Sequence, residues 1–205
     1  MTTTSDKEQI QMLKDWWKQY GSSILFALFA LVVINFGWRY WQQYKHRRAD
    51  YASITYTQML VAAEQHKDDE AKLYADRLIK HYKKSAYAGL AALMQSKLAV
   101  KKGDFKLALE PLQFVIKNSS DNALRQLARI RAARILIETK QPQKAIDMLA
   151  ITDDDAYLAE ISEIQGDALL KLGKTTEAKQ AYQKAKTTSV GDAEPPLLQL
   201  KMQQL

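Results

Sequence analysis

The sequence predicts an all-α protein in which one N-terminal transmembrane helix is followed by a solenoid of helical hairpins. Three observations support this prediction. Helix-forming residues dominate the 205-residue chain, which contains only 7 Gly and 4 Pro. An uncharged stretch of 20 residues lies near the N-terminus. Beyond it, alanine-anchored segments recur at intervals of 33 to 37 residues, a period typical of stacked helical hairpins.

The composition limits the chemistry that the chain can perform. It contains no Cys, which excludes disulfides, thiolate metal sites and cysteine nucleophiles. The 30 Lys and Arg outnumber the 23 Asp and Glu, and this excess is unevenly distributed, with +3 over residues 39–50 and +4 over residues 51–205, but it forms no dense basic face. Because proteins that bind nucleic acid usually concentrate their positive charge in a patch, we expect no nucleic-acid partner.

The uncharged stretch extends from Gln19 to Trp38 and contains the continuous apolar run of residues 24–34. In a helix that rises about 1.5 Å per residue, 20 residues span about 30 Å, the hydrocarbon thickness of a bilayer. All four Trp flank the apolar run together with several Tyr, and amphipathic rings of this kind gather at both membrane interfaces. The predicted interface anchors are Trp16, Trp17, Tyr20, Trp38, Tyr40 and Trp41.

A buried core helix and a cleaved signal peptide are the alternatives for this stretch. A soluble core helix rarely carries every Trp of the protein at its two ends. A cleaved signal peptide ends in small residues, whereas the aromatic residues 38–41 follow the apolar run here. We therefore expect an uncleaved signal anchor over residues 22–43, which separates a short N-terminal segment, residues 1–21, from a repeat domain, residues 44–205.

Four segments of the repeat domain combine a turn with a helix that begins near an alanine. Their spacings are 37, 37 and 33 residues, and the anchoring residues are Ala71, Ala108, Ala145 and Ala178. The second segment also has Gly103 at its turn, whereas the third has Lys140 there and the first is degenerate. A shared period with variable detail is typical of a solenoid that is built from one structural unit.

The last segment is the most regular and resembles the tetratricopeptide repeat (TPR). Gly166 occupies the position where that repeat needs a small residue, and Gly173 suits the left-handed turn that ends the first helix. Ala178 and Tyr182 match the step from a small residue to an aromatic one. The residues expected to form the repeat scaffold are Gly103, Ala108, Ala145, Gly166, Gly173, Ala178 and Tyr182.

These scaffold residues are expected to pack between helices, so that contacts with a partner come from other, polar positions. After residues 189–192 the chain resumes with Pro195 and Pro196 and continues amphipathically to Leu205. We expect this last segment to be a capping helix that covers the apolar face of the final repeat.

The sequence shows no catalytic motif. His46, His66 and His81 lack the spacing of a zinc site, and neither a nucleophile elbow nor a phosphate-binding glycine loop is present. The acidic residues 153–155 could bind a cation, but their position favours an N-cap and first turn for a helix that begins near Ala156. We therefore predict a protein without enzymatic activity, cofactor or metal.

Over essentially its full length the chain resembles the YfgM family, an ancillary subunit of the bacterial SecYEG translocon. The matching segments are residues 15–21, 37–42, 86–93, 166–169 and 196–201. This resemblance implies a single-pass protein of the bacterial inner membrane, with a cytoplasmic N-terminus and a TPR-like domain in the periplasm. It also implies an adaptor whose partners are the SecYEG translocon, the periplasmic chaperone PpiD, emerging secretory chains and membrane lipid.

The charges beside the anchor favour the opposite orientation by a small margin. Three Lys precede the uncharged stretch of residues 19–38 and four Lys or Arg follow it by residue 48, which favours a cytoplasmic C-terminal domain by one residue. We follow the resemblance, because a margin of one residue is weak evidence. Two other functions are a membrane-anchored TPR scaffold or regulator of envelope complexes unrelated to secretion, and a TPR receptor that faces the cytoplasm.

Overall fold

The computed structural model describes residues 3–189 and 197–204, and every regular element within these ranges is helical. The predicted all-α fold is therefore confirmed. The chain divides into two compact units, Met1–Asp50 and Tyr51–Leu205. The finer division expected from the sequence, at residues 1–21, 22–43 and 44–205, stays a prediction.

Helix α1 spans Thr3–Glu64, and its first part forms the described portion of the first unit. Nine large apolar side chains between residues 25 and 36 are exposed, from 45% for Val32 to 74% for Phe26. No helix in the described part of the chain reaches the length and apolar character that a membrane crossing requires. The transmembrane helix expected over residues 22–43 stays a prediction, and the side chains of residues 22–24 and 27 lie outside the description.

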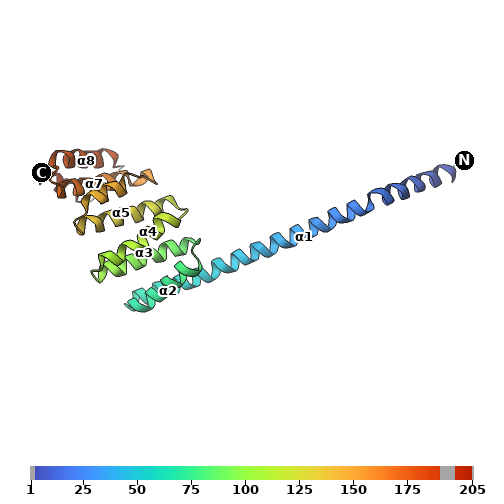
Figure 1. Ribbon diagram of the computed structural model, residues 1–205, viewed down its shortest axis with the longest axis horizontal. Helices are drawn as coiled ribbons and strands as arrows, with labels where there is room; N and C mark the ends of the chain where they lie inside the picture. The colour runs from blue at the N-terminus through green and yellow to red at the C-terminus, as the bar shows by residue number, and fades with distance from the viewer. Residues whose placement is uncertain (1–2, 190–196, 205) are drawn as a thin grey trace. The chain divides into compact units, whose positions relative to one another are not determined.

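The second unit is a stack of helical hairpins that are joined by short loops (Figure 1). Its helices after α1 are α2 (Asp68–His81), α3 (Ala86–Lys101), α4 (Phe105–Asn118), α5 (Asn122–Glu138), α6 (Pro142–Leu149), the 3-10 helix η1 (Asp155–Tyr157), α7 (Leu158–Lys171), α8 (Thr175–Thr188) and α9 (Leu198–Gln203). The end of α1 packs with α2, and the further hairpins are α3 with α4, α5 with α6, and α7 with α8. The predicted solenoid of helical hairpins is thus confirmed.

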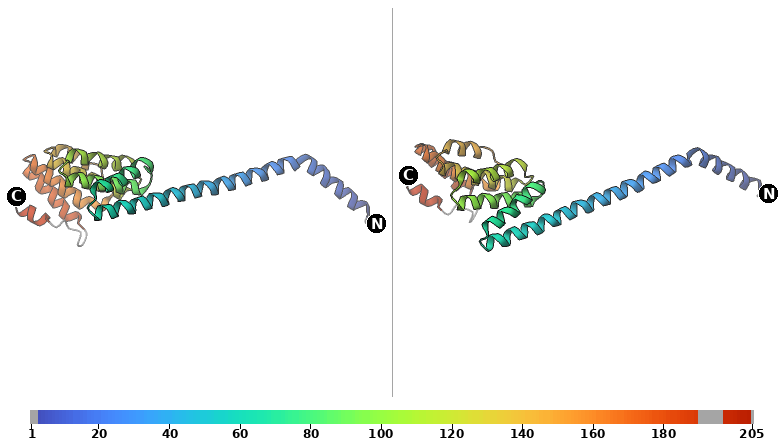
Figure 2. Two further views of the ribbon diagram at one scale, coloured as in Figure 1. Left: turned by 90° about the horizontal axis from the view of Figure 1, so that it is seen from below. Right: turned by 60° about the horizontal axis from the view of Figure 1, so that its bottom comes forward.

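The helices α2 to α8 lie side by side in chain order, as Figures 1 and 2 show. Each of these helices contacts the next one along the chain, and α5 also contacts α7 directly. Side-chain oxygens of Ser85, Asp104 and Asp121 accept hydrogen bonds from the first turns of α3, α4 and α5. Local capping therefore fixes where several of these helices begin.

The core is a row of small apolar clusters that lie between successive hairpins. One cluster joins the end of α1, α2 and α3, a second joins α3, α4 and α5, and a third joins α5, α6 and α7. The last cluster joins α8 to α9. Alanine is frequent in these clusters, because its small side chain lets neighbouring helices approach closely. Each of the first three clusters therefore joins one hairpin to the next, as in other solenoids.

Candidate protein-binding surface

All four hairpins have the same turn between their two helices. A residue with positive φ ends the first helix and precedes the anchoring alanine by five positions: His66 (57°), Gly103 (78°), Lys140 (59°) and Gly173 (75°). The N–H of the next residue donates to a carbonyl five positions earlier, over 2.8 to 3.0 Å. This hydrogen bond and the left-handed residue define the Schellman motif, which satisfies the last carbonyls of the first helix.

The structure places the predicted scaffold residues at these turns and between the paired helices. Gly103 and Gly173 are two of the turn residues, and the alanines at positions 108, 145 and 178 are fully buried. Gly166 on α7 faces Tyr182 on α8, and a Cβ atom added at Gly166 would lie 2.5 Å from the Tyr182 ring. Sequence reasoning missed the turn role of His66, although its spacing from Ala71 equals that of the turn glycines.

Two buried residues lie at equivalent positions of each hairpin, seven residues before and nine residues after the turn residue, and they differ in size. The small residue lies on the first helix and the large residue on the second in three hairpins: Ser96 with Leu112, Ala133 with Leu149, and Gly166 with Tyr182. The first hairpin reverses this order, with Met59 on α1 and Ala75 on α2. The combined size of the two side chains is therefore similar in all four hairpins, although the residue types differ.

A polar cluster closes the C-terminal end of the solenoid. The Tyr182 hydroxyl donates to Asp167 over 2.8 Å, and the Lys201 ammonium donates to Glu163 over 2.6 Å and to Asp167 over 2.7 Å. Burial and the Asp167 bond raise the pKa of Tyr182. Burial acts to lower the pKa of Lys201, but its bonds to Asp167 and Glu163 outweigh burial and raise it.

The capping helix predicted near the C-terminus is present as α9, which begins at Leu198. Leu198 is fully buried and belongs to the same apolar cluster as Tyr182. Pro195, Pro196 and Leu205, which belonged to the predicted helix, lie outside the described residues. The apolar face of the last hairpin is thus covered, and Lys201 fixes the covering helix by its ion pairs.

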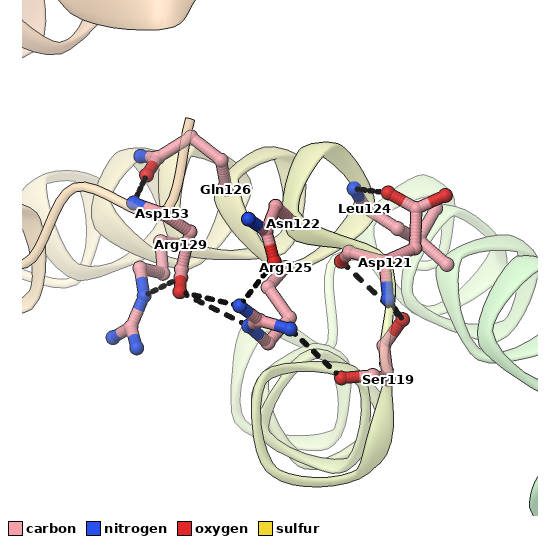
Figure 3. A network of polar contacts seen from close by, with 8 residues as sticks. All are labelled: Ser119, Asp121, Asn122, Leu124, Arg125, Gln126, Arg129 and Asp153. Atoms are coloured by element: carbon pink, nitrogen blue, oxygen red, sulfur yellow. Dashed lines mark hydrogen bonds and ion pairs between the residues drawn. The ribbon is translucent and has the colours of Figure 1, made fainter. Parts of the chain in front are cut away.

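A second polar cluster fixes the loop between α6 and α7 to α5 (Figure 3). Asp153 in this loop receives hydrogen bonds from Arg125 over 3.0 Å and from Arg129 over 2.7 Å. The Asp153 N–H donates to the side chain of the buried Gln126 over 2.7 Å. Arg125 also donates to the carbonyl of Ser119, so the cluster connects two loops and a helix.

This cluster corrects part of the interpretation of residues 153–155. Asp154 does cap the short helix η1, because its side chain accepts from the Ala156 N–H over 3.0 Å. Asp153 is instead an ion-pair partner, and α7 begins at Leu158, two residues later than expected. Burial alone would raise the pKa of Asp153, but hydrogen bonds from Arg129 and Arg125 outweigh it and hold that pKa below its usual value. No local sequence pattern indicates these contacts, because Arg129 and Arg125 lie 24 and 28 residues away from Asp153.

A groove of about 390 Å³ lies between α2, α3 and α4. Its apolar wall includes Leu98, Leu107 and Phe114, and exposed Lys72 and Glu110 lie on its rim. Its volume lies within the range of small ligand and peptide side-chain sites. Because the rim carries both charges around apolar side chains, the groove suits a polypeptide segment better than a small ion.

Two exposed ion pairs lie beside this groove, and one member of each pair lines it. Asp68 accepts from Lys101 over 2.9 Å, and Asp69 accepts from Lys102 over 3.2 Å. The hydrogen bond from Lys101 is the main reason why the pKa of Asp68 lies below its usual value. Both carboxylates come from the first turn of α2, whereas Lys101 ends α3 and Lys102 follows it, so these exposed pairs connect the two helices.

The remaining predicted residues bring no catalytic group together. Among the His, Asp and Glu side chains that the structure describes, no three gather closely enough to hold a metal ion. His66 forms a turn, and the side chain of His46 lies outside the description. The six predicted interface anchors are all exposed, between 46% for Tyr20 and 75% for Tyr40, and their membrane role stays a prediction.

The hairpins correspond to a known family. A family profile described as "Tetratricopeptide repeat-like domain" matches residues 14–205. The chain belongs to this family. The TPR-like character predicted from the last repeat is thereby confirmed for most of the chain.

Three relatives are similar to the chain over almost all of their length, and each is named "Ancillary SecYEG translocon subunit". The relative from Aggregatibacter actinomycetemcomitans is 28% identical, over 99% of this chain and 98% of its own. The relatives from Haemophilus influenzae and Escherichia coli K12 are 27% and 25% identical, over 98% of this chain and 97% of theirs. The resemblance to the YfgM family is confirmed by these matches.

Proposed function

We propose that the chain is a membrane-anchored adaptor of the bacterial Sec translocon. In this proposal it links SecYEG to a periplasmic chaperone of the PpiD kind and assists proteins that emerge into the periplasm. The observation that carries the proposal is similarity to ancillary SecYEG translocon subunits over 97% or more of their length, which includes both α1 and the hairpins. An adaptor needs binding surfaces rather than catalytic groups.

Residues 22–43 supply the membrane anchor in this proposal. The exposed apolar side chains between residues 25 and 36 form a surface that is stable only in lipid or against other apolar helices. The exposed rings of Trp16, Trp17, Trp38 and Trp41 lie on both sides of this surface, where an anchor meets the two membrane interfaces. The same helix surface could contact translocon helices within the bilayer.

The hairpin unit supplies the protein-binding function. We assign partner binding to the groove between α2, α3 and α4, where Leu107 is 44% exposed beside charged rim residues. Tethering to the membrane raises the effective concentration of such a site near the translocon, so a weak contact is sufficient. In the proposed topology the N-terminus lies in the cytoplasm and the hairpins lie in the periplasm.

Affinity purification of the tagged full chain from solubilised bacterial membranes tests the translocon association. We expect SecYEG to be recovered with the chain. The control variant replaces residues 22–43 by an unrelated transmembrane helix of the same length, which keeps the chain in the membrane but removes its specific helix surface. We expect this variant to recover little SecYEG. Absence of SecYEG from the wild-type sample would contradict the proposal.

Substitution in the groove tests the chaperone link separately. We expect Leu107→Asp to reduce co-purification of the PpiD-like chaperone about ten-fold, the effect of about 1.4 kcal/mol, while SecYEG recovery is unchanged. Ile151→Asp is the matched control, because Ile151 is an exposed apolar residue outside the groove. Equal loss of chaperone in both variants would refute the assignment of the groove.

The alternative function is a membrane-anchored scaffold or regulator of envelope complexes unrelated to secretion. The same purification separates it from the adaptor, because a scaffold of this kind recovers cell-wall machinery and no SecYEG. The groove and the exposed helix surface would serve either function, and the relatives' names favour the adaptor.

A further inference from the structure

The first hairpin leaves exposed a face that the later hairpins bury. On α1, Ile54 is 56% exposed and Val61 is 45% exposed. The apolar residues at the same register of α3, α5 and α7 are at most 9% exposed: Ala91 with Leu98, Ala128 with Ile135, and Ile161 with Ala168. We call the exposed surface of Ile54, Gln58, Val61, Glu64 and Gln65 the N-terminal edge face.

The second helix of the preceding hairpin covers this register in every later hairpin. Ala91 and Leu98 share an apolar cluster with residues of α2, and Ala128 and Ile135 share one with residues of α4. The corresponding residues of α7 share a cluster with α6. At the other end of the solenoid, α9 covers α8 through Leu198. The solenoid itself therefore shows that an α-helix fits this face.

A groove at the N-terminal edge face repeats the groove described above. Residues of α1 and α2, including Gln58, Val61 and Tyr74, line a groove of about 200 Å³. The residues 37 positions later are Gln95, Leu98 and Pro111, and all three line the groove between α2, α3 and α4. In that second groove α2 forms the opposite wall. The first groove therefore has lining residues at equivalent positions, which a helix from another chain could cover as α2 covers the second groove.

The charged residue beside the N-terminal edge face differs in sign from its equivalent on α3, and this difference indicates which charge a partner helix needs. The covering helix α2 presents Asp68 to Lys101, and they pair over 2.9 Å. The residue equivalent to Lys101 on α1 is Glu64, which is exposed. A helix that covers the N-terminal edge face in the same way therefore needs a basic residue where α2 has Asp68.

We propose that the N-terminal edge face binds an amphipathic helix of a partner protein. This helix presents small or aliphatic residues toward Ile54 and Val61, as α2 does toward Ala91 and Leu98 in the apolar cluster that they share, and it carries Lys or Arg at the position of Asp68. The inference rests on the geometry of the solenoid and holds independently of the translocon function. It adds a second binding surface to the groove between α2, α3 and α4.

A synthetic peptide derived from α2 is the probe that tests this site. The fluorescently labelled peptide has the sequence of residues 67–82 with the substitution Asp68→Lys, and its anisotropy is titrated with the purified full chain. We expect saturable binding, which Ile54→Glu in the full chain weakens at least ten-fold. Ile151→Glu is the matched control, because Ile151 is 54% exposed at another site, and we expect unchanged binding. Circular dichroism verifies that both variants keep their helical content.

Charge reversal provides an independent test of the register. We expect wild-type chain to bind the Asp68→Lys peptide about two- to five-fold more tightly than the unmodified peptide, as for an exposed ion pair. Glu64→Lys should invert this preference, because it restores the charge of Lys101 at the equivalent position. A preference that is the same in both proteins would overturn the proposed register.

Three further results would overturn the proposal. One is the absence of saturation up to about 1 mM peptide, far above the concentrations of useful partner binding. A second is equal binding by the Ile54→Glu and Ile151→Glu variants. The third is a stable dimer of the full chain in sedimentation experiments that Ile54→Glu dissociates, because the face would then be occupied by a second copy.

Discussion

The first hairpin places Met59 of α1 opposite Ala75 of α2, whereas the last hairpin places Gly166 of α7 opposite Tyr182 of α8. All four residues are buried, and in each pair one residue lies seven positions before the left-handed turn residue and the other nine positions after it. The two residues of each pair therefore have a similar combined size, and the large residue can be on either helix of the hairpin. Packing density, rather than residue identity, is what the fold requires there.

The two ends of the solenoid also differ in how they are covered. Helix α9 buries the face of the last hairpin through Leu198 and through the ion pairs of Lys201. At the other end, the first helix of the first hairpin exposes Ile54 and Val61, on the face that the preceding hairpin covers in every later hairpin. A solenoid needs caps at both ends to remove apolar surface from water. The uncovered end is therefore the one that we expect to bind another protein.

Exchange of the large and small residues in the first hairpin gives the largest expected effect. Met59→Ala should lower the free energy of unfolding by about 3 kcal/mol, because Met59 is fully buried and its removal leaves a cavity. Adding Ala75→Met should recover at least half of this loss, since the pair then has the order found in the other hairpins. Urea denaturation of the full chain measures both changes. If the two substitutions are additive, the pairs do not compensate each other.

Overpacking of the last hairpin is expected to have the next largest effect. Gly166→Leu should destabilise the hairpin by about 2 kcal/mol, because its Cβ alone would lie 2.5 Å from the Tyr182 ring. Gly37→Leu is the control, since a Cβ at Gly37 meets no atom within 4 Å. Thermal unfolding followed by circular dichroism compares the two variants. An unchanged midpoint for Gly166→Leu would show that the register of the last hairpin is wrong.

The third hairpin differs from the second in the length of its second helix, because α6 has 8 residues and α4 has 14. The loop that follows the short α6 contains Asp153, which forms ion pairs with Arg125 and Arg129 of α5. Asp153→Asn should destabilise the chain by about 1.5 kcal/mol at pH 7, because Arg125 and Arg129 lose a charged partner. The lowered pKa of Asp153 stabilises the fold above the unfolded pKa of about 3.9, and this contribution is lost as the pH falls through the folded pKa.

The difference in stability between wild type and Asp153→Asn should therefore shrink below about pH 4. Denaturation at a series of pH values measures it. Asp155→Asn changes the same charge at an exposed neighbouring position and serves as the control. A difference that stays constant down to pH 3 would show that the Asp153 charge does not stabilise the loop.

The turn residues give the smallest expected effects. His66 and Lys140 have positive φ without being glycine, whereas Gly103 and Gly173 adopt it without strain. Lys140→Gly should therefore stabilise the chain by about 0.5 kcal/mol, and Gly103→Ala should destabilise it by about 1 kcal/mol. High-precision urea titrations resolve the two signs. Destabilisation by Lys140→Gly would mean that the lysine side chain contributes more than its backbone strain costs.

The sequence predicted those features that local patterns determine. Gly173, Ala178 and Tyr182 occur within ten residues, and their spacing indicated the last hairpin before its contacts were known. The first hairpin was degenerate by the same criterion, because its large and small residues are exchanged and His66 replaces the turn glycine. A sequence motif that specifies one residue type at each position does not match a hairpin in which the large and small residues have exchanged helices.

Contacts between distant residues were beyond prediction from the sequence. Asp153 was interpreted as a helix cap because acidic residues precede a helix, and its partner Arg125 lies 28 residues away. Ile54 and Val61 continue the same apolar periodicity as the buried residues of α3, so the sequence pattern did not distinguish an exposed end from a core. Both features depend on how hairpins stack, which periodicity alone does not specify.

Protease accessibility of a C-terminal tag in intact spheroplasts tests most directly whether the hairpins act on the periplasmic side of the translocon. The protease is added to cells that produce the full chain, and a cytoplasmic protein serves as the control for membrane integrity. We expect the tag to be digested while the cytoplasmic control stays intact. A tag that is protected until the spheroplasts are lysed would place the hairpins in the cytoplasm, and would contradict the periplasmic adaptor in favour of a cytoplasm-facing receptor.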